Sequence, residues 1–368
     1  MLSSHSEFKM KIVTIIGARP QFIKAAALSR EFAKHTCINE IIIHTGQHFD
    51  KNMSDVFFDE MEIPRPNYHL NINGLGHGAM TGQMLEGIEK ILIGERPDFV
   101  LVYGDTNSTL AGALASKKLH LKLVHVEAGL RSFNMLMPEE INRILTDRIS
   151  DILFVPTKQA IQNLNKEGFE NFDCKIVRSG DIMQDAVLFY SKHAAEKSTI
   201  IQTLGLESSS FVLATIHRAE NTEDLKRLVS IVGALNEINK TFKVVSPVHP
   251  RTRAIFEKNN IQTDFVCIDP VGYFDMIQLM SNCSLICTDS GGLQKEAYFF
   301  NKYCITFRDQ TEWVELVENG YNRITGANKD FILDAFGYFK DKPFHKATEL
   351  YGAGNASKII TEFLIKQN

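Results

Sequence analysis

Charged side chains follow several short apolar runs of this sequence, at the points where the runs end. Asp105 and Glu127 follow two such runs in the first half of the chain, His217 follows one in the second half, and Glu139 opens a helical pattern after Pro138. Carboxylates that are crowded or desolvated acquire raised pKa values, and together with a histidine they can act as general acid and base. The pattern therefore predicts an acid–base site, although a helix cap at Asp105 or a helix-dipole role for Glu139 would use the same residue types.

A second group of residues is suited to binding an anion. The turn 288–292 follows an apolar run and opens a helical pattern, so Ser290 is expected to be the N-cap residue. Gly291 and Gly292 would let a ligand approach the backbone, and the helix N-terminus would attract its negative charge. Glu296, near the start of that helix, could accept hydrogen bonds from a ribose. These features favour a diphosphate site, while a plain capped helix start would explain the same residues.

Other chemistries lack their sequence signatures. The turn GARP (17–20) has a single glycine, so no dinucleotide cofactor is predicted. The turn at 291–292 lacks the Lys-Ser/Thr end of a P-loop and is therefore not one. No serine or cysteine stands with a histidine at nucleophile spacing, and no metal-ligand motif is present, which argues against acyl transfer and a metal centre. The formal charge of −4 and the absence of basic–aromatic interleaving argue against a nucleic-acid partner.

Nothing in the sequence predicts a membrane partner. No run approaches 18 apolar residues, and residues 1–11 lack the apolar core of a signal peptide. The six cysteines form no CxxC pair, and Cys287 lies in the apolar run SLICT, which is typical of a buried strand. We therefore expect buried, reduced thiols in a cytoplasmic protein.

Apolar, β-branched runs alternate with amphipathic segments along the whole chain. About eleven runs are expected to be strands, at residues 11–17, 40–45, 98–104, 121–126, 151–157, 175–180, 211–216, 242–248, 264–269, 284–289 and 303–307. Their spacing predicts an α/β fold with βαβ crossovers and parallel sheets. Because one open sheet of this size would be unusual, we predict two doubly wound sheets, connected by the polar segment 191–210. Ligands bind at the carboxyl ends of such strands, so two facing sheets would enclose a cleft.

Eight motifs in order make the sequence recognisable: GARPQFIK (17–24), GDTNST (104–109), HVEAGLRS (125–132), PEEINR (138–143), HRAEN (217–221), PVHPR (247–251), TDSGGLQKEA (288–297) and RDQTE (308–312). Together they resemble the non-hydrolysing UDP-N-acetylglucosamine 2-epimerase family. The resemblance implies the GT-B fold, in which two Rossmann-like domains face a cleft. The expected first domain is 10–180 plus 352–368, where the last helix crosses back, and the second is 181–351, which would bind the UDP moiety.

The resemblance also assigns roles to individual residues. Catalytic roles fall on Asp105, Glu127, Glu139 and His217. Substrate contacts fall on Arg19, Lys24, Gln47, His48, Arg131, Arg218, His249, Ser290, Gly291, Gly292, Glu296 and Arg308, some of which match positions near a second, regulatory UDP-sugar site. The implied reaction converts UDP-N-acetylglucosamine to UDP-N-acetylmannosamine. UDP would leave in an anti elimination that forms 2-acetamidoglucal and would then add back. No cofactor or metal is implied, and family members are commonly homodimers that serve surface-polysaccharide synthesis.

Several departures from the family pattern concern the substrate. The segment SFNMLM before PEE is short, Trp313 replaces an arginine in TEWVE (311–315), and Arg-Ala-Glu replaces the usual Arg-Arg-Glu after His217. These variants resemble the branch that acts on UDP-2,3-diacetamido-2,3-dideoxy-glucuronate, so this sugar nucleotide is the second candidate substrate. The sequence also leaves open a hydrolysing 2-epimerase, a GT-B glycosyltransferase and a non-catalytic nucleotide-sugar sensor.

Overall fold

A computed structural model describes residues 10–47, 64–208, 210–346 and 349–367. The chain forms two compact units. Unit 1 comprises Met1–Ala186 and Glu349–Asn368, and unit 2 comprises Val187–Thr348. The predicted domain boundary after residue 180 lies just before a helix, whereas the two units divide within that helix.

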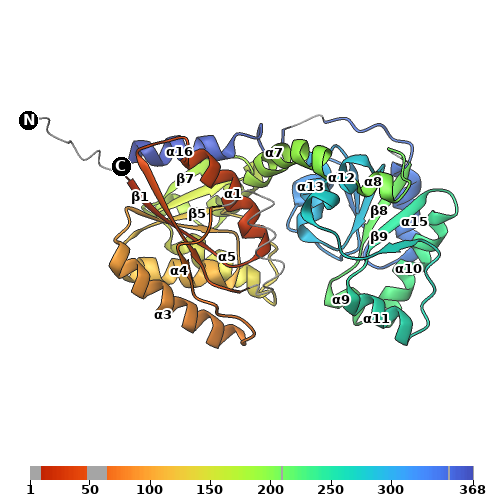
Figure 1. The fold of residues 1–368 in the computed structure, drawn as a ribbon, viewed down its shortest axis with the longest axis horizontal. Helices are drawn as coiled ribbons and strands as arrows, with labels where there is room; N and C mark the ends of the chain where they lie inside the picture. The colour runs from red at the N-terminus through yellow and green to blue at the C-terminus, as the bar shows by residue number, and fades with distance from the viewer. Residues whose placement is uncertain (1–9, 48–63, 209, 347–348, 368) are drawn as a thin grey trace, which may run out of the picture. The chain divides into compact units, whose positions relative to one another are not determined.

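Unit 1 is built on a seven-stranded parallel sheet with the strand order β3-β2-β1-β4-β5-β6-β7 (Figure 1). Its strands are β1 (Met10–Ile16), β2 (Ile38–His44), β3 (Tyr68–His69), β4 (Phe99–Tyr103), β5 (Lys122–Val126), β6 (Ile152–Val155) and β7 (Lys175–Arg178). Every strand of this sheet pairs in parallel with its neighbours. The order reverses direction on either side of β1, which is the doubly wound arrangement.

Helices cover both faces of the sheet of unit 1. They are α1 (Arg19–Phe32), α3 (His77–Glu95), α4 (Asn107–Lys118), α5 (Pro138–Ile149), α6 (Lys158–Lys166), the first residues of α7 (Ile182–Lys197) and α16 (Ala356–Gln367), with a short 3-10 turn at Phe169–Asn171. Helices α1 and α16 pack together on one face, and α3, α4 and α5 cover the other (Figure 1). The central strands are therefore buried on both faces, which explains their continuous apolar sequences.

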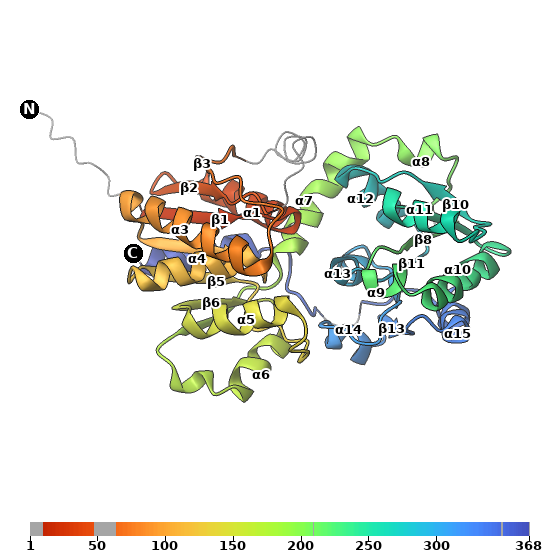
Figure 2. The ribbon, with the colours of Figure 1, turned by 90° about the horizontal axis from the view of Figure 1, so that it is seen from below.

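Unit 2 has a six-stranded sheet with the order β10-β9-β8-β11-β12-β13, also parallel throughout. Its strands are β8 (Phe211–Thr215), β9 (Lys243–Pro247), β10 (Val266–Ile268), β11 (Leu285–Thr288), β12 (Tyr303–Thr306) and β13 (Asn322–Ile324). Its helices, besides the rest of α7, are α8 (Ile200–Thr203), α9 (Ala219–Thr222), α10 (Leu225–Asn239), α11 (Pro250–Lys258), α12 (Tyr273–Asn282), α13 (Gly291–Phe299), α14 (Val314–Glu318) and α15 (Lys329–Phe339). Helices α10 and α15 lie side by side (Figure 2).

The predicted fold class, two doubly wound parallel sheets, is confirmed, and all eleven predicted strands are present. The prediction missed β3 and β13, which have only two and three residues and include polar side chains. The segment 191–210, predicted to connect the two sheets, does lie between β7 and β8, but much of it is helical and belongs to α7 and α8. Its Lys, Ala and Glu residues are strong helix formers, and polarity alone did not distinguish a surface helix from a loop. Among the described residues, no helix has the length and apolar character needed to cross a bilayer.

Candidate functional sites

A pocket of about 200 Å³ opens in unit 1 where strands end and helices begin. Of the predicted site residues, it brings together Lys24 from α1, Gln47 after β2, Asp105 after β4 and Glu139 at the start of α5. Glu139 is exposed and lies in the first turn of its helix, as predicted. Two carboxylates, a lysine and an amide thus line one concave surface, a combination suited to proton transfer on a polar ligand.

Asp105 is held by residues of α5 that the sequence did not point to. Arg143 Nη2 lies 2.7 Å from Asp105 Oδ2, and Asn142 Nδ2 donates to the Asp105 carbonyl oxygen at 2.9 Å. The N-cap of α4 is Thr106, whose side chain accepts a hydrogen bond from Thr109 N. Asp105 is therefore not the helix cap, and its half-buried carboxylate is directed by an arginine on the neighbouring helix.

Glu127 forms a buried ion pair with Lys24. The strand β5 ends at Val126, and Glu127 has a φ of +71°, so Glu127 does not continue the side-chain alternation of the strand. The turn before Asp105 packs on this pair: Gly104 has a φ of +61°, and a Cβ there would lie 3.3 Å from both Glu127 Oε2 and Lys24 Nζ. Only glycine suits that backbone and that space.

At the N-terminus of α1, backbone N–H groups are bound by the side chain of Gln21. Gln21 Oε1 accepts hydrogen bonds from Gly17 N at 2.8 Å and Ala18 N at 3.1 Å. These two amides are therefore occupied by a side chain of the protein. The side chain of Arg19 and the whole of His48 lie outside the described residues. Gln47 Oε1 accepts from Ser108 N at 3.1 Å and from its hydroxyl at 2.8 Å.

His217, which follows β8 in unit 2, is oriented by a buried aspartate. His217 Nδ1 lies 2.9 Å from Asp289 Oδ1, and Asp289 also accepts from the backbone N–H groups of His217 and Arg218. Burial raises the pKa of Asp289, but its hydrogen bond and charge interaction with His217 outweigh burial and lower the pKa. An ionised Asp289 can only accept, so Nδ1 of the half-exposed His217 ring donates to it, and Nε2 is the ring nitrogen left to face a ligand. Asp289 was missed as a site residue, although an aspartate ending a buried strand was the available signal.

The glycine turn of unit 2 opens α13 as predicted. Ser290 is the N-cap residue but makes no side-chain cap hydrogen bond; its backbone N–H donates to Thr288 Oγ1 at 2.9 Å. A Cβ at Gly291 would lie 2.4 Å from Glu312 Oε1, whereas a Cβ at Gly292 would meet nothing within 4 Å. Close packing therefore explains why position 291 is a glycine, but it does not explain Gly292. The missing side chain of Gly292 leaves open space at the N-terminus of α13.

Two predicted substrate arginines are buried. Arg131 donates from Nε and Nη2 to Glu167 at 2.6 and 2.9 Å and from Nη1 to Asp147 at 2.7 Å. The guanidinium of Arg131 is buried between these two carboxylates and so has a structural role, while its predicted contact with the substrate stays a prediction. Arg308 is also buried and pairs with Glu312 at 2.9 Å.

The other predicted residues of unit 2 lie at helix starts. Arg218 and His249 are the N-cap residues of α9 and α11, and His249 Nδ1 accepts from Arg251 N at 3.2 Å. Glu296 is buried in α13. Their contacts with a substrate stay predictions.

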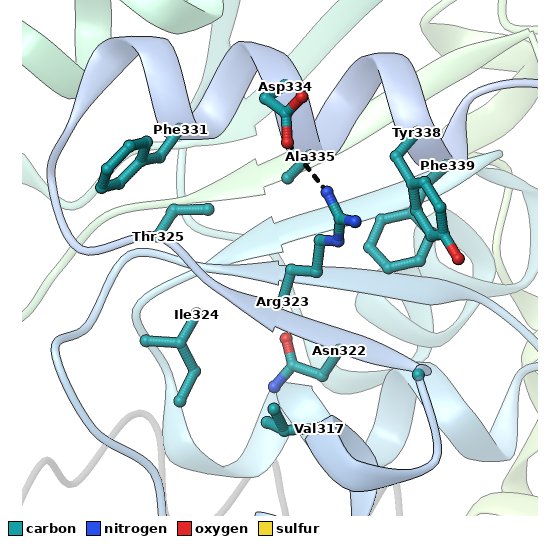
Figure 3. Close-up of a pocket in the computed structure, with 11 residues that line it drawn as sticks. Val317, Asn322, Arg323, Ile324, Thr325, Phe331, Asp334, Ala335, Tyr338 and Phe339 are labelled. Carbon is teal, nitrogen blue, oxygen red and sulfur yellow. Dashed lines mark hydrogen bonds and ion pairs between the residues drawn. The ribbon is translucent and has the colours of Figure 1, made fainter.

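A larger pocket of unit 2, of about 510 Å³, follows the edge strand β13 and helix α15 (Figure 3). Arg323 lies in it, 2.9 Å from Asp334 and with its guanidinium 3.9 Å from the Tyr338 ring centre. None of the predicted site residues lines this pocket. In the described part of the chain, no group of three or more His, Cys, Asp and Glu side chains could hold a metal ion.

Comparisons with known proteins show which family this chain is similar to. The sequence profile of the UDP-N-acetylglucosamine 2-epimerase family matches residues 30–365. A UDP-2,3-diacetamido-2,3-dideoxy-D-glucuronate 2-epimerase of Pseudomonas aeruginosa is 55% identical over 97% of this chain and 100% of that protein.

Solved structures show the same fold. A UDP-GlcNAc 2-epimerase of Methanocaldococcus jannaschii in complex with UDP-GlcNAc and UDP has a TM-score of 0.88 and 40% identity, covering 97% of this chain and all of that one. A UDP-GlcNAc 2-epimerase of Neisseria meningitidis bound to UDP-GlcNAc has a TM-score of 0.86 and 32% identity, with the same coverage. The chain therefore belongs to the UDP-N-acetylglucosamine 2-epimerase family.

Proposed function

We propose that this enzyme inverts C2 of a UDP-linked 2-acetamido sugar, converting UDP-N-acetylglucosamine to UDP-N-acetylmannosamine. The observation that carries the proposal is the pocket of unit 1, where Asp105 and Glu139 line the same surface as Lys24, the ion-pair partner of Glu127. Inversion at C2 needs a base on one face of the sugar and an acid on the other, and several carboxylates around one pocket can supply both.

The proposed reaction proceeds by elimination and re-addition. One carboxylate takes the C2 proton as the C1–O bond breaks, so that the electrons of the C–H bond form the C1–C2 double bond of 2-acetamidoglucal and UDP leaves as an anion. A proton then returns to the opposite face of C2 while UDP adds back to C1. Because the hard step breaks a weakly acidic C–H bond, groups that hold the departing diphosphate contribute directly to the rate.

Unit 2 is proposed to hold the UDP. The start of α13 offers Ser290 and the open space at Gly292 to the diphosphate, and Glu296 is assigned to the ribose. The pair of His217 and Asp289 supplies a histidine with a fixed donor at Nδ1, which can exchange a proton through Nε2 during the reaction.

A second substrate, UDP-2,3-diacetamido-2,3-dideoxy-glucuronate, is favoured by the 55% identity to the Pseudomonas aeruginosa enzyme. Among the departures from the family pattern, Trp313 does not contribute to this choice directly: it is buried and donates from Nε1 to Gly291 O at 2.8 Å. This hydrogen bond helps to hold the glycine turn in place.

The deciding experiment incubates the enzyme separately with each UDP-sugar in D2O and follows C2 by NMR. We expect deuterium at C2 together with the 2-epimer of at least one substrate, and the ratio of the two kcat/KM values identifies the physiological one. Release of a free sugar would instead indicate a hydrolysing enzyme, and binding without exchange at C2 would indicate a sensor.

The proposal also includes a homodimer in the cytoplasm that serves surface-polysaccharide synthesis. The six cysteines form no disulfide, which suits a reducing compartment. Light scattering of the purified protein tests the dimer.

A further inference from the structure

A buried histidine–aspartate pair lies beneath the carboxylate turns of unit 1. His125 on β5 and Asp147 on α5 have fully buried side chains, and His125 Nδ1 lies 2.7 Å from Asp147 Oδ1. Neither residue lines the pocket. Burying two ionisable groups is costly unless their hydrogen bonds are satisfied, so the pair needs a structural or functional reason.

The hydrogen bonds of His125 define its protonation. His125 Nε2 lies 2.7 Å from Gly104 O, and a carbonyl oxygen can only accept, so Nε2 donates. Burial raises the pKa of Asp147, but the charges and hydrogen bonds of His125 and Arg131 outweigh burial and lower it. An ionised Asp147 also only accepts, so Nδ1 donates as well. Both ring nitrogens of His125 therefore face acceptors, a geometry that suits the imidazolium form.

The second oxygen of Asp147 reaches a different turn. Asp147 Oδ2 accepts from Gly129 N at 3.0 Å and from Arg131 Nη1 at 2.7 Å, and Arg131 in turn pairs with Glu167. With His125 in the imidazolium form, His125 and Arg131 supply two positive charges and Asp147 and Glu167 two negative ones. The charges of the network thus cancel, which lowers the free-energy cost of burying them.

Two contacts of this network end beside carboxylates of the proposed site. Gly104 directly precedes Asp105, and Gly129 follows Glu127 by two residues. Both glycines have positive φ, +61° and +78°, which glycine adopts readily, but Glu127 also has a positive φ, +71°, which a residue with a Cβ keeps only where its surroundings hold it. Asp147 itself belongs to α5, the helix whose first turn carries Glu139.

We propose that Asp147 and His125 are positioning residues that hold the turns of Asp105 and Glu127 in a fixed position relative to Glu139. The inference rests on the proposed epimerase function. A single carboxylate, Asp147, ties two loops and one helix together, so its loss would misplace all three acidic groups at once. A displacement of about 1 Å can cost on the order of a hundredfold in rate.

The test is the shape-conserving variant Asp147→Asn, whose amide nitrogen cannot accept a hydrogen bond, so that either the contact with His125 or the contacts with Gly129 and Arg131 are lost. We expect kcat for epimerisation to fall about tenfold to a hundredfold, while KM for the UDP-sugar changes less than threefold. In the wild-type protein, ¹⁵N NMR of labelled histidine should show both nitrogens of His125 protonated at pH 7. If Asp147→Asn does not fold, Glu167→Gln weakens the same network at its half-buried end, with a smaller loss of kcat expected.

Asp151→Asn is the matched control. Asp151 accepts from Leu123 N at 2.7 Å at the other end of β5 and pairs with Lys117, so this change should affect stability without lowering kcat. A wild-type kcat in folded Asp147→Asn, an equal loss in both variants, or a neutral His125 ring would overturn the inference. If the wild-type enzyme turned over neither sugar, the proposed function would fail, while the NMR spectrum would still decide the state of His125.

Discussion

At the scale of single residues, the charged groups of both units are defined by partners that are distant in sequence. Lys24 pairs with Glu127, Arg143 with Asp105, and Asp289 with His217. The motifs identified both members of the first pair as functional and one member of each of the other two, because residue type and position after a strand are visible in a sequence. The pairing itself could not be predicted, since it depends on which turns the folded sheet brings together.

The pH dependence of stability is predicted from one of these buried groups, His44 at the end of β2. Burial first, and then the nearby His69, lower the pKa of His44 from 6.5 to about 4. Between these values the unfolded chain binds a proton that the native protein does not, so stability falls as the pH is lowered from 6.5 to 4. The shift corresponds to about 3 kcal/mol. Urea unfolding at pH 7 and pH 4.5 measures this loss.

His44→Phe should reduce that pH-dependent loss, because phenylalanine does not titrate and can keep the stack on Phe22, whose ring centre lies 5.1 Å from that of His44. His35→Gln is the control, since His35 is partly exposed beside Glu31 and should leave the loss unchanged. An unaltered pH dependence in His44→Phe would assign the effect to another group.

At the scale of elements, the sequence predicted strands better than connections. The strands β1, β4, β8 and β11 lie inside their sheets, so their sequences are almost wholly apolar and easily recognised. The edge strands β3 and β13 have few neighbours to bury them and therefore little signal. The last residues of α7 lie in the segment predicted to connect the two sheets, and the polarity of that segment did not indicate that it is helical.

The start of α13 yields a prediction about UDP binding. In Gly292→Ala the added methyl group meets no atom within 4 Å, and the backbone φ of Gly292 is not positive, so the protein should be at least as stable as the wild type. If the diphosphate lies against this turn, the methyl group occupies its space. We expect the affinity for UDP to fall at least about tenfold, or 1.4 kcal/mol. Calorimetric titration with UDP and thermal unfolding measure the two quantities.

Gly337→Ala is the matched control for that variant. Gly337 also lies in a helix, α15, with no atom near the added Cβ, so the substitution should leave UDP affinity unchanged. Gly291→Ala provides the contrast, because its Cβ would clash with Glu312 and should lower stability as well as affinity. If Gly292→Ala bound UDP as tightly as the wild type, the diphosphate would not lie against this turn.

At the scale of the whole molecule, the chain leaves unit 1 within α7 and returns to it at residue 349. Asp185 receives the returning segment: it accepts hydrogen bonds from the backbone N–H groups of Ala356 and Ser357 at the start of α16. Nothing in the residues 349–368 indicates which sheet they join, so their return was expected only from the family resemblance. Their apolar face finds its partner through tertiary packing against α1.

This return makes the stability of unit 1 depend on the last residues of the chain. Leu364 on α16 is fully buried, and Leu364→Ala should lower the free energy of unfolding of unit 1 by about 3 kcal/mol through lost contacts and the cavity left behind. Hydrogen exchange should show faster exchange in β1 and β4, while β8 and β11 of unit 2 keep their protection. Glu362→Ala, on the exposed face of the same helix, should change neither. Equal loss of protection in both sheets would mean that the two units unfold as one cooperative body.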